Sequence, residues 1–211
     1  MTDVWSERAE AYRASDAHSQ GRDLELFAQW AEGETALDVA TGGGHVARVL
    51  GEAGFEVVTI DSAPGMRPTV VSRAEEIPFA DSSFDVVACR VAAHHFQDAG
   101  SALKEMARVS RALVLLSDNL FIGDAGEQAD KLRDPTHVRN YSEAEWRGMF
   151  EGAELAVEAY ELEDKRIDFG SWLARSGTPD EDRPRIRELL ADRVEGGKLR
   201  LERAIFKARK N

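Results

Sequence analysis

Cysteine is nearly absent from this chain, since Cys89 is the only one among 211 residues. A single cysteine excludes an intramolecular disulfide framework and any zinc site built from several thiolates. The chain is nevertheless long enough to bury a hydrophobic core without such cross-links, and its length predicts one domain over residues 1–211. We therefore expect a protein of a reducing compartment, with the cytoplasm as its location.

Long apolar runs and an excess of basic residues are also missing. No stretch reaches the roughly 18 apolar residues that a membrane-spanning helix requires, and the chain starts without the basic and apolar regions of a secretory signal. Lys and Arg number 27 against 39 Asp and Glu, so the net charge is −12. A field of this sign repels phosphate backbones. The sequence predicts neither a membrane span nor a nucleic-acid partner.

Short β-branched runs alternate with longer helical stretches in the first half of the chain. Strands are expected at residues 35–39, 56–60, 69–71, 84–89 and 112–117, with helices at 45–52 and 99–109. This rhythm is typical of βαβ units. The run "ALVLL" at 112–116 has the continuous apolar pattern of a strand buried on both faces of a parallel sheet.

The second half of the chain completes the expected sheet. A capping box of Ser142 and Glu145 predicts a helix start in "YSEAEWRGMF". Residues 155–162 and 203–210 are expected to be two late strands that close one edge of the sheet. The fold class is therefore α/β, with a doubly wound, mostly parallel, seven-stranded sheet. Residues 1–30 are open to two interpretations, an N-terminal helical lid or ordinary core helices.

A glycine-rich turn in "LDVATGGGHVA", residues 37–47, joins the first expected strand to the first helix. Such a turn exposes backbone N–H groups beside the positive end of a helix dipole, and glycine lets a ligand approach closely. Residues 42–47 fit the pattern G-x-G-x-x-G/A. Asp61 follows 19 residues after Gly42, where an acidic side chain can accept hydrogen bonds from a ribose. A nucleotide-type ligand is expected here.

Two ligands suit this turn, a nicotinamide dinucleotide and S-adenosylmethionine. Asp38 favours the second, because its carboxylate would repel a pyrophosphate but would attract the ammonium group of the methionine portion. A nicotinamide-dependent oxidoreductase stays open as an alternative, although the chain has no Tyr-x-x-x-Lys pair for its chemistry.

The motifs of the chain carry a family resemblance. "LDVATGGGHVA", "TIDSAPGM", "AEEIPFADSSFDVVACRVAAHHFQD" and "LKEMARVS" with "LVLLSDN" resemble, in order, those of class I S-adenosylmethionine-dependent methyltransferases. They are most similar to the type 11 branch, which includes enzymes of ubiquinone and menaquinone biosynthesis. The resemblance spans about residues 5–175.

This resemblance implies S-adenosylmethionine as the cofactor, S-adenosylhomocysteine as the product and a small organic molecule as the methyl acceptor. It places Asp61 at the ribose, and it places Arg90 where the stretch facing the sulfonium and the acceptor begins. The implied cofactor-binding residues are Asp38, Ala40, Thr41, Gly42, Gly43, Gly44, Asp61, Ser62, Met66, Ala74, Glu75 and Arg90.

The chain departs from the family pattern at three places. Arg73 stands where an aspartate commonly accepts a hydrogen bond from the adenine, and "SRA" at 110–112 replaces a Gly-Gly turn. Only seven residues separate Asp61 from Thr69, fewer than a helical crossover needs. The usual crossover helix must therefore be missing. These departures motivate a further alternative, a protein that binds S-adenosylmethionine without turnover.

Methyl transfer from a sulfonium is an in-line displacement that depends mainly on orientation in a water-poor pocket. A base is needed only for a protonated acceptor, and histidine suits that role near neutral pH. The candidate catalytic residues are His94, His95 and His137, each equally open to a structural role. No metal site is predicted, because Arg90 stands where metal-dependent relatives carry an aspartate.

Overall fold

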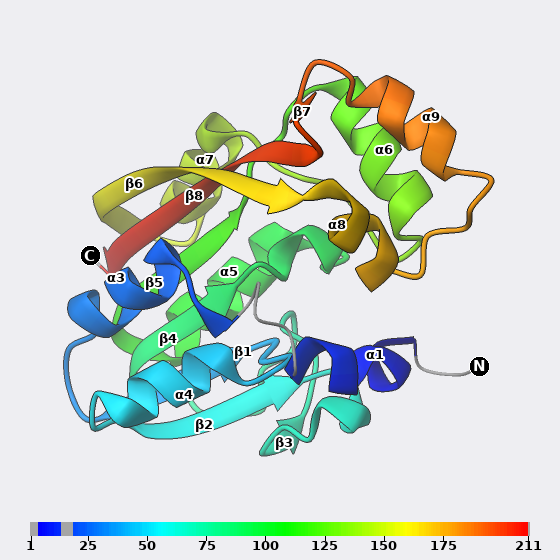
Figure 1. Cartoon of the computed structure of the whole chain (residues 1–211). Helices are drawn as coiled ribbons and strands as arrows, with labels where there is room; N and C mark the ends of the chain where they lie inside the picture. The colour runs from blue at the N-terminus through cyan, green and yellow to red at the C-terminus, as the bar shows by residue number, and fades with distance from the viewer. Residues whose placement is uncertain (1–3, 14–18, 211) are drawn as a thin grey trace.

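The computed structural model describes residues 4–13 and 19–210, apart from the side chains of residues 11 and 12. Its strands are β1 (Thr35–Val39), β2 (Glu56–Asp61), β3 (Val70–Val71), β4 (Phe84–Arg90), β5 (Ser110–Asn119), β6 (Leu155–Asp168), β7 (Val194–Glu195) and β8 (Lys198–Lys210). They form one sheet of order β3-β2-β1-β4-β5-β8-β6, with β7 beside β8 (Figure 1). Strands β1 to β5 pair in parallel, whereas β8 is antiparallel to β5 and β6. The predicted fold class is confirmed, and β7 is an unpredicted eighth strand.

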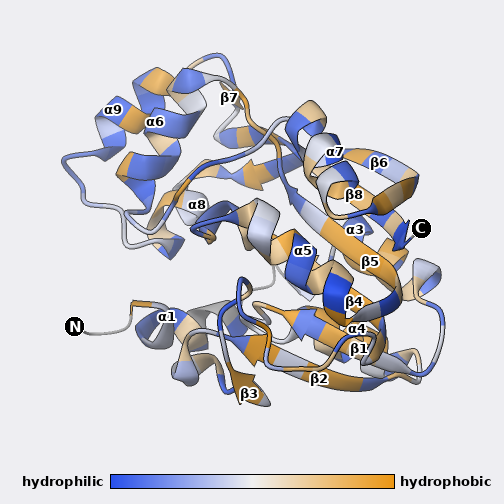
Figure 2. Ribbon diagram, turned by 180° about the vertical axis from the view of Figure 1, so that it is seen from behind, coloured by the Kyte–Doolittle hydropathy of each residue, from blue (hydrophilic) through white to orange (hydrophobic). Residues whose placement is uncertain are grey.

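Helices cover both faces of this sheet. Helices α3 (Arg22–Trp30) and α4 (His45–Glu52) lie on one face, and α5 (Ala99–Val109) and α7 (Glu143–Gly152) lie on the other, as Figures 1 and 2 show from opposite sides. Alternate residues of a strand point to opposite faces. In β1, Leu37 and Val39 therefore pack on the α5 side, while Ala36 packs on the α3 side. Helices α4 and α5 have the predicted bounds.

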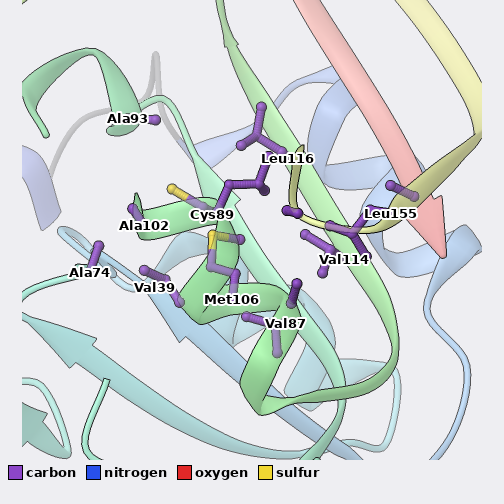
Figure 3. Packing of buried hydrophobic residues seen from close by; sticks show 14 of the residues in the cluster. Val39, Ala74, Val87, Cys89, Ala93, Ala102, Met106, Val114, Leu116 and Leu155 are labelled. Carbon is purple, nitrogen blue, oxygen red and sulfur yellow. The ribbon is translucent and has the colours of Figure 1, made fainter. Parts of the chain in front are cut away.

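The core between the sheet and α5 contains the single cysteine. Val87 and Cys89 of β4 and Val114 of β5 pack near Met106 of α5 (Figure 3), and each is at most 1% exposed. Burial raises the pKa of the Cys89 thiol well above its ordinary value. A buried, protonated thiol is a poor nucleophile, so Cys89 is a packing residue.

Strands β6 and β8 form a long antiparallel pair that extends past the rest of the sheet. The ladder between β5 and β8 ends at the pair Asn119 and Arg203, whereas β6 and β8 pair as far as Asp168 and Lys198. Residues 163–168, which are mostly charged, were not expected to be strand. They continue the antiparallel pairing with β8 as far as Asp168, while their side chains alternate between half-buried and exposed.

The protruding β6–β8 pair carries a small helical cap. Helices α6 (Asp124–Arg133), α8 (Phe169–Arg175) and α9 (Arg183–Leu189) pack with it around Phe169, Trp172 and Ile186. The cap therefore lies beyond the carboxyl ends of the parallel strands (Figure 1). The predicted capping box is confirmed at α7, where Ser142 and Glu145 bond each other's backbone N–H groups.

The crossover from β2 to β3 contains no α-helix, as its length predicted. One turn of 3-10 helix, η1 (Pro64–Met66), replaces it, and α1 (Val4–Arg13) packs against this turn. Gly65 donates a hydrogen bond to the Ser6 hydroxyl at 2.8 Å, and a Cβ on Gly65 would lie only 2.5 Å from Cα of Ser6. Glycine is thus required for α1 to approach so closely.

The N-terminal helices divide between the core and the ligand side of the sheet. Trp5 of α1 lines the cavity described below, whereas Leu24 of α3 is 3% exposed in the core. A lid function for residues 1–30 stays a prediction, and Tyr12 and His18 lie outside the described side chains. No helix in the described part of the chain is long and apolar enough to cross a lipid bilayer.

Candidate active site

A cavity opens at the carboxyl ends of β1, β2, β4 and β5, where open α/β sheets bind their ligands. One wall is the glycine-rich turn after β1, and the opposite wall comes from the β6–β8 pair and its cap. Two residues at this edge have strained backbone: Ala40 and Val91, which directly follow β1 and β4, have φ of 55° and 51°. Positive φ is costly for a β-branched residue such as Val91, and such strain clusters at functional sites.

Most predicted cofactor-binding residues line this cavity. Asp38, Ala40, Thr41, Gly42, Gly43, Asp61, Ser62, Met66 and Arg90 do so. Gly44 does not; it is the N-cap of α4, with φ of 77°. Ala74 and Glu75 line an adjoining depression that shares Asp61 and Ser62 with the cavity.

Two aspartates hold the glycine-rich turn. Asp38 accepts hydrogen bonds from the Thr41 hydroxyl at 2.6 Å and from the Ala47 backbone N–H at 3.1 Å. Asp61 accepts from the backbone N–H of Gly42 at 3.0 Å and from that of Ala63 at 2.9 Å. The Asp61 carboxylate lines the cavity, so it is placed to accept hydrogen bonds from hydroxyl groups of a ligand.

The charge of Asp38 depends on what occupies the cavity. Burial, with a smaller contribution from the nearby Asp61 charge, raises the pKa of Asp38 to about 7, although the bonds from Thr41 and Ala47 oppose this. A positively charged ligand group beside Asp38 would stabilise its carboxylate form. The turn therefore presents a carboxylate that a cation would complement.

Arg73, which replaces the aspartate of the family pattern, lines the depression together with Ala74 and Glu75. It is exposed and forms an ion pair with Glu75 at 3.4 Å. Glu75 in turn accepts hydrogen bonds from the backbone N–H groups of Gln97 and Asp98. The depression around Ala74 is thus bounded by an ion pair on its outer side.

His94 and Asp118 form a buried pair at the carboxyl ends of β4 and β5. Nδ1 of His94 lies 2.6 Å from Asp118, which also accepts from the His94 backbone N–H at 3.0 Å. Burial alone would lower the pKa of His94, but the Asp118 carboxylate outweighs it and the pKa is raised. With Nδ1–H donated to Asp118, the free lone pair of neutral His94 is on Nε2. His94 lines the cavity, so this arrangement is that of an oriented base.

The other two predicted histidines have different surroundings. His95 lines the cavity with its ring 4.6 Å from that of Trp5, and burial, together with the neighbouring His94, lowers its pKa to about 3. His137 is not among the cavity residues; it packs behind His94 and lies 3.2 Å from Glu127. Only His94 combines access to the cavity with a raised pKa.

His137 belongs to a group of three side chains that the sequence analysis missed. Glu127, Asp130 and His137 have potential ligand atoms within 4.8 Å of one another. Their carboxylates already accept hydrogen bonds from Asn140, whose backbone N–H bonds Glu127 and whose side chain bonds Asp130. These hydrogen bonds attach the segment that follows α6 to that helix, which explains why the three side chains lie together.

Two similarities identify the family. Residues 37–114 match the type 11 family model, described as a methyltransferase domain. YcgJ, an uncharacterized methyltransferase of Bacillus subtilis, is 33% identical over 200 residues, which cover 83% of this chain and 79% of that protein. The chain belongs to the type 11 branch of the class I methyltransferases. The crystal structure of YcgJ matches this methyltransferase with a TM-score of 0.83 and 28% identity, over 92% of this chain and 99% of that one.

Other relatives of this methyltransferase agree with that assignment. The crystal structure of a putative methyltransferase from Bacillus halodurans has a TM-score of 0.80 at 30% identity, covering 90% of this chain and 99% of that one. A demethylmenaquinone methyltransferase of Renibacterium salmoninarum is 35% identical over 89 residues, which cover 37% of this chain and 38% of that protein.

Arg90, which the family resemblance places near the sulfonium, is held in a buried ion cluster of this methyltransferase. Its guanidinium bonds both carboxylate oxygens of Asp23, at 2.7 and 3.0 Å, and Arg203 bonds the same carboxylate at 3.1 Å. Asp23 is fully buried, and the two arginines are 9% and 6% exposed. Sequence analysis missed Asp23 and Arg203, because the three residues come from distant parts of the chain.

Proposed function

We propose that this methyltransferase uses S-adenosylmethionine and transfers the methyl group to a small organic acceptor at oxygen, carbon or nitrogen. The transfer is an in-line displacement that releases S-adenosylhomocysteine. The observation that carries this proposal is the convergence of the glycine-rich turn, Asp38 and Asp61 on one cavity. We further propose that the enzyme acts in the cytoplasm and takes no nucleic acid as substrate.

The residues of the cavity suit the chemical groups of S-adenosylmethionine. Asp61 is placed to accept hydrogen bonds from the ribose diol, and Asp38 has a carboxylate that an ammonium group would stabilise. A Cβ added to Gly44 would meet nothing within 4 Å, and one added to Gly42 would meet only a carbonyl oxygen at 3.9 Å. The turn thus leaves open space beside its backbone N–H groups.

The chain's own residues would orient the reaction and handle its proton. S-adenosylmethionine supplies an electrophilic methyl group when bound. Asp38 and Asp61 would fix its position, and the cap would limit water at the opposite side of the cavity. His94, oriented by Asp118, would take the proton of a hydroxyl or other protonated acceptor on Nε2. His95 and His137 would support the His94 ring from neighbouring positions.

Calorimetric titration with S-adenosylmethionine, S-adenosylhomocysteine and NAD tests this proposal. We expect both sulfur ligands to bind and NAD to bind far more weakly, because Asp38 is poorly suited to a pyrophosphate. Binding of NAD without binding of either sulfur ligand would favour an oxidoreductase. Binding of the sulfur ligands without release of S-adenosylhomocysteine over a broad acceptor panel would favour a binding protein that lacks turnover.

Asp61→Ala is expected to weaken binding of S-adenosylmethionine about 10- to 150-fold. The reason is that the ribose hydroxyls lose a charged acceptor, which contributes about 1.5–3 kcal/mol. Because Asp61 also bonds the turn, Asp61→Asn serves as a second variant that retains one acceptor oxygen. Calorimetry should show the highest affinity for the wild type, a lower affinity for Asp61→Asn and the lowest for Asp61→Ala. Equal affinities would contradict the ribose assignment.

Affinity for S-adenosylmethionine is expected to fall about tenfold from pH 8 to pH 6. Burial raises the pKa of Asp38 to about 7, so the side chain is mostly ionised at pH 8 and mostly neutral at pH 6. Only the ionised form attracts the ligand's ammonium group. Asp38→Asn should remove this pH dependence, which titrations across the range would measure. A wild-type profile as flat as that of the variant would refute the role of Asp38.

A further inference from the structure

The cavity wall opposite the glycine-rich turn is strongly cationic. Five basic side chains line the cavity: Arg90, Arg133, Lys165, Arg175 and Arg203. The carboxylates that line it are Asp38 and Asp61, which both belong to the turn side. This distribution is opposite to that of the whole chain, whose net charge is −12. A local excess of positive charge inside an acidic protein needs an explanation in terms of what the cavity binds.

Two of the basic side chains that line the cavity are buried and share a carboxylate. Asp23 is shared by Arg90 and Arg203, so one carboxylate faces two guanidinium groups. Arg203 additionally bonds the neutral Asn119 oxygen at 3.3 and 3.4 Å. Buried charges are costly unless they are paired. A ligand anion beside Arg203 would add a second acceptor group to the shared Asp23 carboxylate.

Lys165 adds a third cation to this cluster. A Cβ placed on Gly21 would lie 3.4 Å from Nζ of Lys165 and 3.3 Å from the guanidinium of Arg90, so both side chains end near the same point. Within residues 4–13 and 19–210, Nζ of Lys165 has no hydrogen-bond or ion-pair partner. An ammonium group that lines a cavity without a partner is available to an anionic ligand.

The pKa of Lys165 is lowered, as expected for a buried ammonium group with too few carboxylates beside it. Burial first, and then Arg203 and Arg90, lower its pKa to about 8, against the opposing influence of Glu163 and Asp23. The two carboxylates that face Lys165 are thus insufficient to keep its pKa at the ordinary value. An anion placed beside it would raise that pKa again.

Apolar side chains from β6, β8 and the cap line the cavity together with these cations. Ile167, Trp172 and Leu201 line it, and the Arg133 guanidinium stacks on the Trp172 ring at 4.5 Å. Arg133 is fixed there by a 2.6 Å bond to the Ser176 hydroxyl. The cationic wall is thus combined with an apolar surface large enough to contact a ring or an aliphatic chain.

We propose that the methyl acceptor is an organic anion, with its carboxylate or phosphate group against Lys165 and Arg203 and its apolar body against Ile167, Trp172 and Leu201. The identification of the bound anion as the methyl acceptor rests on the proposed methyl transfer. The binding of an organic anion at this wall does not depend on that proposal. The methionine carboxylate of the cofactor would pair with one of the other three basic side chains, which leaves Lys165 and Arg203 for the acceptor.

Matched pairs of probes test this inference in calorimetry with saturating S-adenosylhomocysteine. The probes are 4-hydroxybenzoate, 4-hydroxyphenylacetate and phenyl phosphate, with the amides 4-hydroxybenzamide and 4-hydroxyphenylacetamide and with phenol as neutral partners. We expect at least one anion to bind 10- to 100-fold more tightly than its neutral partner. A difference within a carboxylate–amide pair indicates a site for carboxylates, and a difference between phenyl phosphate and phenol indicates a site for phosphates. No preference for the anion in any pair would overturn the proposal.

Lys165→Met and Arg166→Met are the matched variants. Both remove one positive charge from β6, but Arg166 is exposed and is not a cavity residue. Lys165→Met should abolish most of the preference for the anion, whereas Arg166→Met should retain it. Equal loss in both variants would indicate net charge alone and would contradict the site. Unchanged affinity for S-adenosylhomocysteine separates this result from a failure of the proposed function, which would show as no binding of that ligand to the wild type.

Proton uptake supplies a second measurement. At pH 8 an anion beside Lys165 should raise its pKa, so that binding takes up a fraction of a proton, no more than about half. Titrations in Tris and in triethanolamine, two cationic buffers of different ionisation enthalpy, measure this number. Lys165→Met should take up less than the wild type. Identical uptake by both proteins would place the anion elsewhere.

Discussion

Replacing Asp23 by alanine is expected to lower the free energy of unfolding by about 3–5 kcal/mol, the usual cost of removing one partner of a buried ion pair. Asp23 is fully buried and faces Arg90 at 2.7 Å and Arg203 at 3.1 Å. Without it, two buried guanidinium groups lose their shared counter-charge. Asp23→Asn should also be strongly destabilising, because the amide has nearly the same shape but no charge.

Urea unfolding at pH 7 measures this loss, and Glu25→Ala in the same helix is the control. Glu25 forms only an exposed ion pair with Arg22 at 3.3 Å, so its removal should cost less than about 1 kcal/mol. Burial opposes ionisation of Asp23, but the two arginines lower its pKa to about 2. A lowered pKa stabilises the fold above pH 4, and that contribution is lost as the pH falls from about 4 to 2. An Asp23→Ala variant as stable as Glu25→Ala would show that the cluster is not structural.

Local sequence patterns were sufficient for the parallel half of the fold. The helices at 45–52 and 99–109 have the predicted bounds, because each lies between two apolar strands and begins at a definite turn or cap. Asp98, for example, caps the second helix through the Ser101 backbone N–H. The glycine-rich turn and Asp61 were found for the same reason, since their spacing within one βαβ unit is fixed.

The cationic wall could not be predicted in this way, because it depends on contacts between distant segments. Asp23 is 67 residues from Arg90 and 180 residues from Arg203. Lys165 lies in a charged stretch that lacks an apolar strand pattern, and only its pairing with β8 makes it strand. The length of the β6–β8 pair, which positions the cap over the cavity, therefore depends on tertiary contacts.

The sequence alone could not decide which of the three histidines is the base. Their surroundings in the structure distinguish them. Asp118 is 24 residues from His94 along the chain and becomes its partner only because β4 and β5 are adjacent in the sheet. His95 instead bonds the Thr136 carbonyl oxygen at 3.1 Å. This difference in partner gives the two neighbouring imidazoles opposite shifts in pKa.

His94→Asn is expected to reduce turnover about 10²- to 10⁴-fold with any acceptor that must lose a proton, the usual contribution of a positioned base. Asparagine retains a side-chain donor for Asp118 in place of Nδ1 but has nothing in place of Nε2. It therefore avoids the unpaired buried carboxylate that alanine would leave. The measurement is S-adenosylhomocysteine release with the acceptor found in the panel, reported as kcat and KM for each substrate.

The pH profile and the neighbouring histidine distinguish a base from a structural residue. Wild-type kcat should fall tenfold per pH unit below the pKa of His94, which lies above 6.5, because only the neutral imidazole accepts a proton. This limb should be absent in His94→Asn, and added imidazole should restore part of its activity. His95→Asn should lose less than tenfold, since burial and the nearby His94 lower the pKa of His95 to about 3 and make it a weak base. A His94→Asn variant with wild-type kcat would mean that the acceptor arrives without its proton, and the His94–Asp118 pair would then only hold β4 against β5.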